Sequence, residues 1–307
     1  MFFYLLRRLA IGLPTLLVIV TCAFLLMRLA PGGPFEQERG LPAQVKANLE
    51  AAYGLDQPIY IQYTRYLLNL LHGDLGPSLR YRDRSVNELL SRGFPVSASL
   101  GAWAVFAAVL IGVPLGILAA LKKERWPDHL IMSVAVFGIT LPSYVIAPML
   151  ALLFGIYMHW LPVAGYGDGS PRFLTLPVAT LALPFVAYIA RLTRESCIEV
   201  MRAPYILTAR AKGLPSWLIV GRHALKPTLV PVVSYLGPAT AGVLTGSLVI
   251  EQVFGLPGIG RYFVQGAINR DYTLVMGVVV CYAALVIALN IVVDVCYRWL
   301  DPRVVAS

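Results

Sequence analysis

Residues 9–29 read LAIGLPTLLVIVTCAFLLMRL, an apolar run that carries a single charge, Arg28. About 20 apolar residues in an α-helix cross the roughly 30 Å of hydrocarbon in a bilayer, so this run predicts a membrane-spanning helix. The whole chain has the same character, because 58% of its residues are hydrophobic and only 13% are charged. Soluble domains carry about a quarter charged residues. The sequence therefore predicts a polytopic membrane protein.

Five further windows have the length and the low charge of a spanning helix. Together with the first window they predict an all-α membrane protein with six transmembrane helices. The chain then divides into residues 1–29 (first span), 30–94 (outer loop) and 95–307 (a five-span core that contains the loop 191–226). The predicted spans are Leu9–Leu29, Pro95–Leu121, Leu130–Tyr157, Phe173–Ala190, Pro227–Ile250 and Leu274–Tyr297.

The N-terminal segment, MFFYLLRRLAIGLPTLLVIVTCAF, has the basic start and the apolar run of a secretory signal. Its apolar run is long enough to span, and no small-residue cleavage site follows it cleanly. We therefore expect residues 1–29 to remain on the protein as an uncleaved signal anchor.

Lysine and arginine residues are distributed unevenly between the two ends of the predicted spans. Fourteen lie on one side and three on the other, if the long loop 30–94 is left out. By the positive-inside rule the side with fourteen is cytoplasmic, which places both chain termini in the cytoplasm. This asymmetry accounts for the net charge of +9 without a nucleic-acid partner. The fourteen are Arg7, Arg8, Lys122, Lys123, Arg125, Arg191, Arg194, Arg202, Arg210, Lys212, Arg222, Lys226, Arg298 and Arg303, and the three are Arg172, Arg261 and Arg270.

The cytoplasmic stretch 208–231, TARAKGLPSWLIVGRHALKPTLVP, is basic and is broken by glycine and proline. Pro204 suits the first turn of a helix that continues to Lys212, and Gly213 can end it in the left-handed conformation. Pro215 then begins a second helix, SWLIVGRHALK. The sequence predicts a bent helical pair.

Small residues on this pair, Ala209, Ala211 and Gly213, are predicted to form an exposed face that lets a partner protein approach the backbone. The basic residues Arg210 and Lys212 would orient that approach. The alternative is a solvated loop, or a helix that lies at the lipid headgroups.

Several motifs make the chain resemble one family of membrane proteins. The segment ARAKG, followed after nine residues by HALKP, is similar to the cytoplasmic coupling motif of bacterial ABC importer permeases, whose pattern is E-A-A, three residues, Gly, and an apolar tail with proline. Leu207 and Thr208 stand where that pattern has Glu and Ala, and Pro227 lies one place beyond the expected proline. The form TARAKGL is the one that the oligopeptide and dipeptide branch carries.

Three longer stretches resemble the B-type permease subunit of the same branch, and of the oligopeptide permeases in particular. They are LLRRLAIGLPTLLVIVTCAFLLMRLAPGGPF (5–35), YGLDQPIYIQYTRYLLNLLHGDLGPSLRYRDRSVNELL (53–90) and VIEQVFGLPGIGRYFVQGAINRDYTLV (249–275). Their order along the chain is that of the family. The resemblance implies a type I ABC importer permease fold in the bacterial inner membrane.

The same resemblance implies partners and a cargo. No GxxxxGK[ST] phosphate loop occurs in the chain, so ATP has to be bound by a partner. The resemblance implies that two cytoplasmic ATPase subunits bind ATP and Mg, and that a second homologous permease and a periplasmic peptide-binding protein complete the system. The chain would form half of a pathway for oligopeptides or dipeptides. The same role for glutathione or nickel, and an ion-gradient-driven secondary transporter, are the alternatives. The implied ATPase-coupling residues are Thr208, Ala209, Arg210, Ala211, Lys212, Gly213 and Leu214.

Two outer segments are also interpreted. In the loop 30–94, which the resemblance makes periplasmic, apolar residues at helical spacing from Tyr63 to Leu71 predict a short amphipathic helix ended by Gly73. This loop is either a platform for a binding protein or a lid on the spans.

The stretch GLPGIG (255–260) is too rich in glycine for a helix and predicts a tight turn. The resemblance extends this turn to an outer gate, with Glu251 near the outer surface; the gate residues are Glu251, Gly255, Pro257, Gly258 and Gly260.

Other functional classes find little support. The histidines, His72, His129, His159 and His223, are scattered, and no HExxH motif or catalytic pair of carboxylates occurs, so we predict neither an enzyme nor a metal site. Three of the four cysteines fall in predicted spans and Cys197 in a predicted loop, which argues against a disulfide framework. No acidic or histidine relay crosses the middle of the membrane, which argues against proton-coupled transport.

Overall fold

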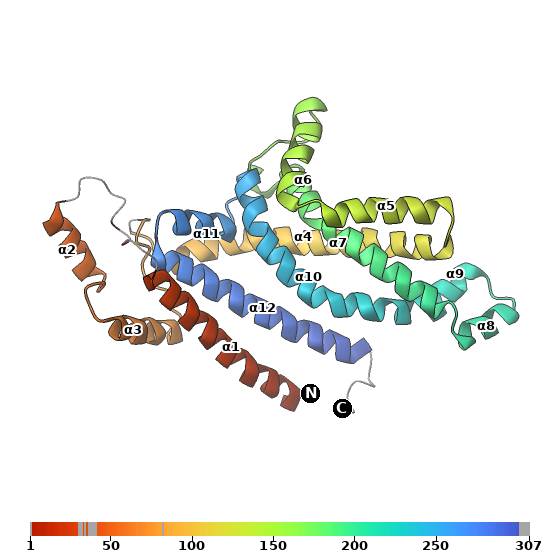
Figure 1. Ribbon diagram of the computed structural model, residues 1–307, viewed down its shortest axis with the longest axis horizontal. Helices are drawn as coiled ribbons and strands as arrows, with labels where there is room; N and C mark the ends of the chain where they lie inside the picture. The colour runs from red at the N-terminus through yellow and green to blue at the C-terminus, as the bar shows by residue number, and fades with distance from the viewer. Residues whose placement is uncertain (1, 30–32, 34, 36–41, 82, 301–307) are drawn as a thin grey trace. The chain divides into compact units, whose positions relative to one another are not determined.

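The structure, a computed structural model, describes residues 2–29, 33, 35, 42–81 and 83–300 (Figure 1). Within these residues the secondary structure is helical apart from one isolated bridge between Pro77 and Ser85, which confirms the predicted all-α class. Arg303 and the side chain of Arg298, which contribute to the predicted orientation, lie outside the described part of the chain.

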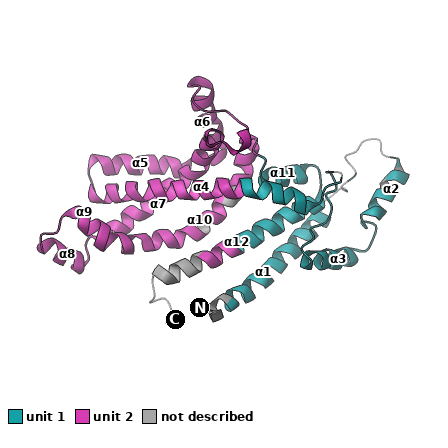
Figure 2. Cartoon of the chain, turned by 180° about the vertical axis from the view of Figure 1, so that it is seen from behind, with its two compact units in different colours: residues 1–96, 257–287 teal, residues 97–256, 288–307 magenta. Residues whose placement is uncertain are grey.

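The chain forms two compact units (Figure 2). Residues 1–96 and 257–287 make up unit 1, and residues 97–256 and 288–307 make up unit 2. Unit 1 contains α1 (Phe2–Leu29), α2 (Ala43–Ala52), α3 (Ile59–Leu71) and α11 (Ile259–Ile268). Unit 2 contains α5 (Trp126–Thr140), α6 (Ser143–Leu150), η1 (Ala151–Tyr157), η2 (Gly167–Gly169), α7 (Pro171–Val200), α8 (Pro204–Ala211), α9 (Ser216–Leu218), η3 (Ile219–Ala224) and α10 (Leu225–Phe254), while α4 (Val86–Leu121) and α12 (Tyr272–Leu300) contribute to both.

Helix α7 is the centre of unit 2, where it packs against α4, α5 and α10. Two glycines of α4 lie against its backbone. A Cβ at Gly116 would lie 2.4 Å from the carbonyl oxygen of Ala190, and one at Gly112 would lie 2.9 Å from that of Val186. This is the GxxxG arrangement, in which the absence of side chains lets two helices in a membrane approach closely. Any larger residue at either position would force α4 away from α7.

The third predicted span, Leu130–Tyr157, is broken. α5 and the segment made of α6 and η1 meet at an angle of 107°, and Figure 1 shows α6 turning sharply away from the axis of α5. Leu141 has extended dihedral angles (φ −80°, ψ 125°) and precedes Pro142. The proline ring disfavours the helical conformation in the residue before it, so the helix ends here.

The fourth span is longer than predicted, because α7 continues from Ala190 to Val200 as one helix. The charges that suggested a loop are accommodated on the helix, where Arg191 and Glu195 form an ion pair four residues apart. Cys197 is buried on the same helix, so the interpretation that places it in a loop is wrong.

In unit 1 the outer loop contains the predicted amphipathic helix. α3 ends at Leu71 and Gly73 follows in the left-handed conformation (φ +75°), as the sequence indicates. Its Tyr63, Tyr66, Leu67 and Leu70 pack on Val20 and Phe24 of α1 and on Met276 and Val280 of α12. The Tyr63 hydroxyl also lies 2.6 Å from Thr21 Oγ1. The outer loop is therefore held on the first span by its own apolar face.

Asp271 ties a second part of the outer loop to α12. Its carboxylate is buried and accepts hydrogen bonds from Ser78 Oγ (2.5 Å) and from the backbone N–H groups of Leu79 and Arg80 (3.2 Å each). It also accepts from the backbone N–H of Leu274 (3.1 Å), which makes it the N-cap of α12. One side chain thus starts a spanning helix and fixes the loop in front of it.

Four of the described helices, α1, α4, α7 and α12, contain segments long and apolar enough to cross a membrane. Two bent pairs, α5 with α6–η1 and the helix from Ser216 to Phe254, raise the number to six if each pair is one span. This range includes the six spans predicted from the sequence.

Candidate coupling segment

The predicted bent helical pair is present at residues 204–224. α8 begins at Pro204 and ends at Ala211, and Gly213 follows with φ +75°. The N–H of Gly213 donates to the carbonyl of Arg210 (2.9 Å) and that of Leu214 to the carbonyl of Ala209 (3.3 Å). These two bonds define the Schellman motif, in which a residue with positive φ closes the helix. The predicted role of Gly213 in the backbone is confirmed.

The inner face of α8 is apolar and tightly packed. Ile206 and Ala209 form a buried cluster with Ile219 and Ala224 of η3, and Leu214 covers its edge. Ala209 is only 7% exposed, so the prediction that its methyl group lies on the accessible face is wrong. Its spacing from Ile206 is that of one helix face, and the second helix covers that face. Ala209 therefore joins the two halves of the pair.

The accessible face is formed by the other predicted residues. Thr208, Arg210, Ala211, Lys212 and Gly213 are exposed, and Leu214 is half-buried. A Cβ at Gly213 would meet no atom within 4 Å, so space for a partner remains at the turn. The surface is basic and has small residues at its tip.

Three large apolar side chains share this exposed part of the chain, and the sequence interpretation missed them. Tyr205, Leu207 and Trp217 are 49%, 54% and 75% exposed. Tyr205 and Leu207 are two residues apart on α8 and so point to different sides of it, while Trp217 lies on α9; large apolar side chains that stay exposed in this way can serve as contacts for a partner protein. The sequence contains one indication of them, because Tyr205 and Leu207 flank the buried Ile206 and cannot share its helix face.

Short connections and apolar contacts join the turn to the helices on both sides. The cluster around Ile206 also includes Val200 at the end of α7. In the other direction α9, η3 and α10 follow one another as a helical run from Ser216 to Phe254, with a π-helical turn at Ile219–Ala224 and a bend of 42° between Gly237 and Ala239. Pro227, which lacks an N–H, follows this wide turn directly. α8 is therefore in apolar contact with the end of α7 and with η3, which leads into α10.

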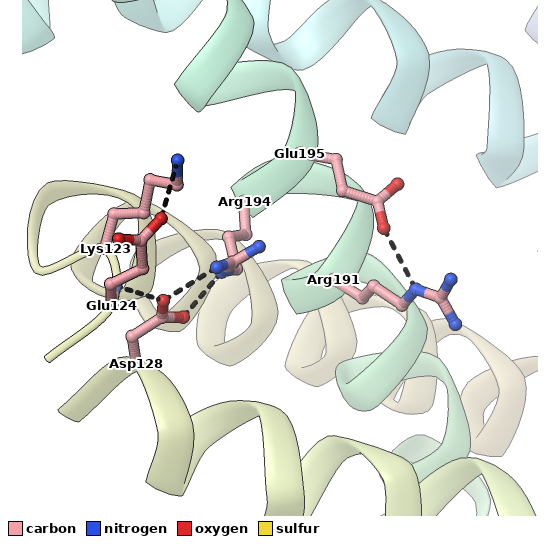
Figure 3. Close-up of polar contacts among 6 residues, drawn as sticks. All are labelled: Lys123, Glu124, Asp128, Arg191, Arg194 and Glu195. Carbon is pink, nitrogen blue, oxygen red and sulfur yellow. Dashed lines mark hydrogen bonds and ion pairs between the residues drawn. The ribbon is translucent and has the colours of Figure 1, made fainter. Parts of the chain in front are cut away.

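An ion pair fixes α5 to α7 a few residues before this segment (Figure 3). Arg194 donates from Nε to Asp128 Oδ1 (2.5 Å) and from Nη2 to Asp128 Oδ2 (2.7 Å), the two-pronged geometry of a strong pair. The Asp128 side chain is 2% exposed, and the backbone N–H of Glu124 donates to it as well. The sequence interpretation used Arg194 only as a positive charge. The pairing depends on a contact between two helices that the sequence pattern does not show.

The neighbouring charged groups are exposed. Lys123 lies 3.0 Å from Glu124, and its hydrogen bond holds the pKa of the Glu124 carboxyl below the ordinary value. Arg191 and Glu195 on α7 are both more than half exposed and point away from the Asp128 pair (Figure 3). Only the Asp128–Arg194 pair joins two helices in this group.

The predicted outer residues lie at the end of α10 and the start of α11. Gly255 has φ +66° and ends α10, which confirms a turn, but Ile259 and Gly260 already belong to α11. Part of the stretch GLPGIG is therefore helical, contrary to the prediction. Glu251 is fully buried within the protein, so its side chain is not exposed at the molecular surface. Within the described residues no group of three or more His, Cys, Asp or Glu side chains could hold a metal ion.

Comparison with known proteins assigns most of the chain to one family. Residues 112–306 match the family described as "Binding-protein-dependent transport system inner membrane component", and residues 1–100 match the N-terminal family of the same systems. The chain is 51% identical to the oligopeptide transport system permease protein OppB of Escherichia coli, over 98% of each chain. It is 44% identical to the dipeptide transport system permease protein DppB of Bacillus subtilis, over 98% of this chain and 97% of the relative.

A solved structure, the inward-facing MetNI methionine ABC transporter, has a similar fold. It superimposes with a TM-score of 0.57 at 19% sequence identity, and the match covers 69% of this chain and 96% of the MetNI chain. At this identity the likeness concerns the fold.

We predict that the Asp128–Arg194 pair contributes to the stability of the protein. Asp128→Asn keeps the shape of the side chain but removes the charge that Arg194 pairs with, so we expect a loss of about 1.5–3 kcal/mol and a lower thermal midpoint. Glu195→Gln, which removes the exposed Arg191–Glu195 pair, should cost at most about 0.5 kcal/mol. Thermal unfolding of both variants in the same lipid checks this; equal midpoints would contradict the assigned role of the buried pair.

Proposed function

This chain belongs to the binding-protein-dependent transport system inner membrane components, as a permease of ABC importers, and we propose that it forms half of a translocation pathway for oligopeptides or dipeptides. The observation that carries the proposal is the 51% identity to an oligopeptide permease over 98% of both chains. The chain lies in the inner membrane and works with ATPase and substrate-binding components, as this class of permease does.

The finer arrangement of partners also belongs to the proposal. Two cytoplasmic ATPase subunits hold ATP and Mg, and a second homologous permease completes the pathway. A single chain has one segment of the α8 type, and two ATPases need two. A periplasmic peptide-binding protein delivers the cargo to the outer side, where residues 30–94 form the large loop.

We infer that the ATPase subunit docks on residues Thr208–Leu214. The accessible basic face, the open space at Gly213 and the exposed side chains of Tyr205, Leu207 and Trp217 support this docking. The buried Ala209 takes part by holding α8 on η3. Because α8 packs on η3 and its cluster includes Val200 at the end of α7, closure of the ATPase subunits would move α7 and α10.

The proposed orientation has both termini in the cytoplasm and the ends of α10 and α11 on the outer side. There, Glu251, Gly255, Pro257, Gly258 and Gly260 form the outer gate. A Cβ at Gly93 of α4 would lie 3.0 Å from the backbone nitrogen of Ile259, so the start of α11 packs closely on α4. This close contact at Gly93 supports a gate in which the start of α11 moves together with α4.

Peptide uptake tests the substrate. The complete complex, reconstituted with a peptide-binding protein and ATPase subunits, should import labelled peptides of graded length, from dipeptides upwards, only when ATP is present. Removal of this chain should abolish import. Uptake of glutathione or nickel ions in place of peptides, or uptake driven by an ion gradient without ATP, would contradict the proposal.

A substitution at Gly213 tests whether residues 208–214 are the coupling segment. Gly213→Val places a β-branched side chain at φ +75°, which costs roughly 1 kcal/mol or more, and its methyl groups occupy the space at the turn. We expect normal membrane insertion, weaker retention of the ATPase subunits, and little peptide uptake.

Gly73→Val is the matched control, because Gly73 has the same φ of +75° and the same open surroundings but lies in the outer loop. It should retain the ATPase subunits as the unmodified chain does. If Gly213→Val retains them equally well, residues 208–214 are not the docking site.

Cysteine labelling tests the orientation. In a background without the four native cysteines, Ser170→Cys should react with an impermeant thiol reagent added to intact spheroplasts, and Ser216→Cys should react only after the membrane is opened. Ser170 lies at the start of α7 and Ser216 just after the α8 turn, on opposite sides of the proposed span. The reverse labelling pattern would overturn the topology.

A further inference from the structure

A cavity of about 230 Å³ lies within unit 1, between the end of α1, the α2–α3 segment and the start of α12. Arg28 and Arg65 both line it, from α1 and α3 respectively. None of the described lining residues is an aspartate or a glutamate. A concave site with two guanidinium groups and no carboxylate in its wall attracts an anion.

Both arginines are held in place by neutral groups. The Arg28 guanidinium carbon lies 5.4 Å from the ring centres of both Phe24 and Tyr272. Arg65 donates from Nη2 to Gln57 Oε1 (2.7 Å). Neither contact neutralises the charge, so each guanidinium retains donors for a ligand. The carboxylate of Asp271 does not line the cavity, and its oxygens already accept the loop and helix bonds described above.

The wall also contains polar atoms that the described residues do not satisfy. Gln62 Oε1 and Tyr66 OH are buried and have no hydrogen-bond partner among these residues. Burial raises the pKa of the Tyr66 phenol to about 12, so it keeps its proton and remains a donor. Buried polar atoms normally have partners, and a ligand with both acceptor and hydroxyl oxygens would provide them after small side-chain rotations.

An apolar groove adjoins the cavity along α1 and α3. Thr21, Phe24, Leu25, Ile59, Tyr60 and Tyr63 line it, and Phe24 lines both the groove and the cavity. Arg28 stands at the end of the first span, Leu6–Leu29, which is the level at which lipid headgroups meet the hydrocarbon. A charged cavity at this level, continued by an apolar groove along the span, matches an amphiphile with an anionic head.

We propose that this is a binding site for an anionic phospholipid, with the phosphodiester between Arg28 and Arg65 and one acyl chain in the groove between α1 and α3. A glycerol headgroup adds hydroxyl oxygens for Gln62 and Tyr66. The lipid would hold α3 on the first span and so stabilise the outer loop. This inference does not depend on the transported substrate.

The test measures lipid binding to the purified complete complex in detergent by native mass spectrometry, with phosphatidylglycerol and phosphatidylcholine as probes. Arg28→Gln and Arg65→Gln should each weaken phosphatidylglycerol binding about tenfold, because each removes a charge-assisted contact. Arg28→Lys should retain most of the binding, since the charge remains. Arg92→Gln is the matched control, because Arg92 also lies in unit 1 but pairs with Glu88 and does not line the cavity.

Three results would overturn the proposal. Equal phosphatidylglycerol binding by the unmodified and the Arg65→Gln complexes would do so, and Arg65 is exposed enough that this variant folds. Phosphatidylcholine that binds as tightly as phosphatidylglycerol would exclude recognition of the anionic head. Glycerol 3-phosphate that competes at the same concentration as the lipid would show a site for a soluble anion.

Discussion

The close approach of α4 to α7 through Gly112 and Gly116 is the contact on which the rest of unit 2 depends. Lipid tails are as apolar as the helix surfaces, so burial of apolar area does not drive spans together, and packing at small residues has to do so. The glycines place the α4 backbone directly on that of α7. Because α7 also carries α5 and α10, its position determines where the remaining helices of the unit lie.

Electrostatics reinforces this packing where the helices approach the candidate coupling segment. The side chain of Asp128 is 2% exposed, and a buried carboxylate needs a well-placed partner; Arg194 meets it with two hydrogen bonds. A few residues later the cluster around Ile206 joins the end of α7 to α8 and η3. α7 is thus fixed on one side by an ion pair and on the other by apolar contacts, which suits a helix that transmits displacement to its neighbours.

In unit 1 the outer loop is built onto the spans by two different interactions. The apolar face of α3 packs on α1 and α12, while the buried carboxylate of Asp271 accepts hydrogen bonds from the backbone N–H groups of Leu79 and Arg80. The cavity with Arg28 and Arg65 lies between these two attachments. Two arginines and no described carboxylate line this cavity at the end of a span. The packing of the loop does not account for this positive charge, whereas an anionic ligand would.

The sequence by itself determined the all-helical class, the apolar segments from which the spans are built, the α3 helix and the left-handed Gly213, because apolar run length and glycine chemistry are local properties. It also contained the family motifs. Only the tertiary structure decided that Ala209 and Glu251 are buried, that Asp128 meets Arg194 and that the third span bends at Pro142 by 107°. These depend on which helix faces which, and a linear pattern cannot report the partner that covers a given face. The bend had a local indication in Leu141–Pro142, but its angle is determined by packing around it.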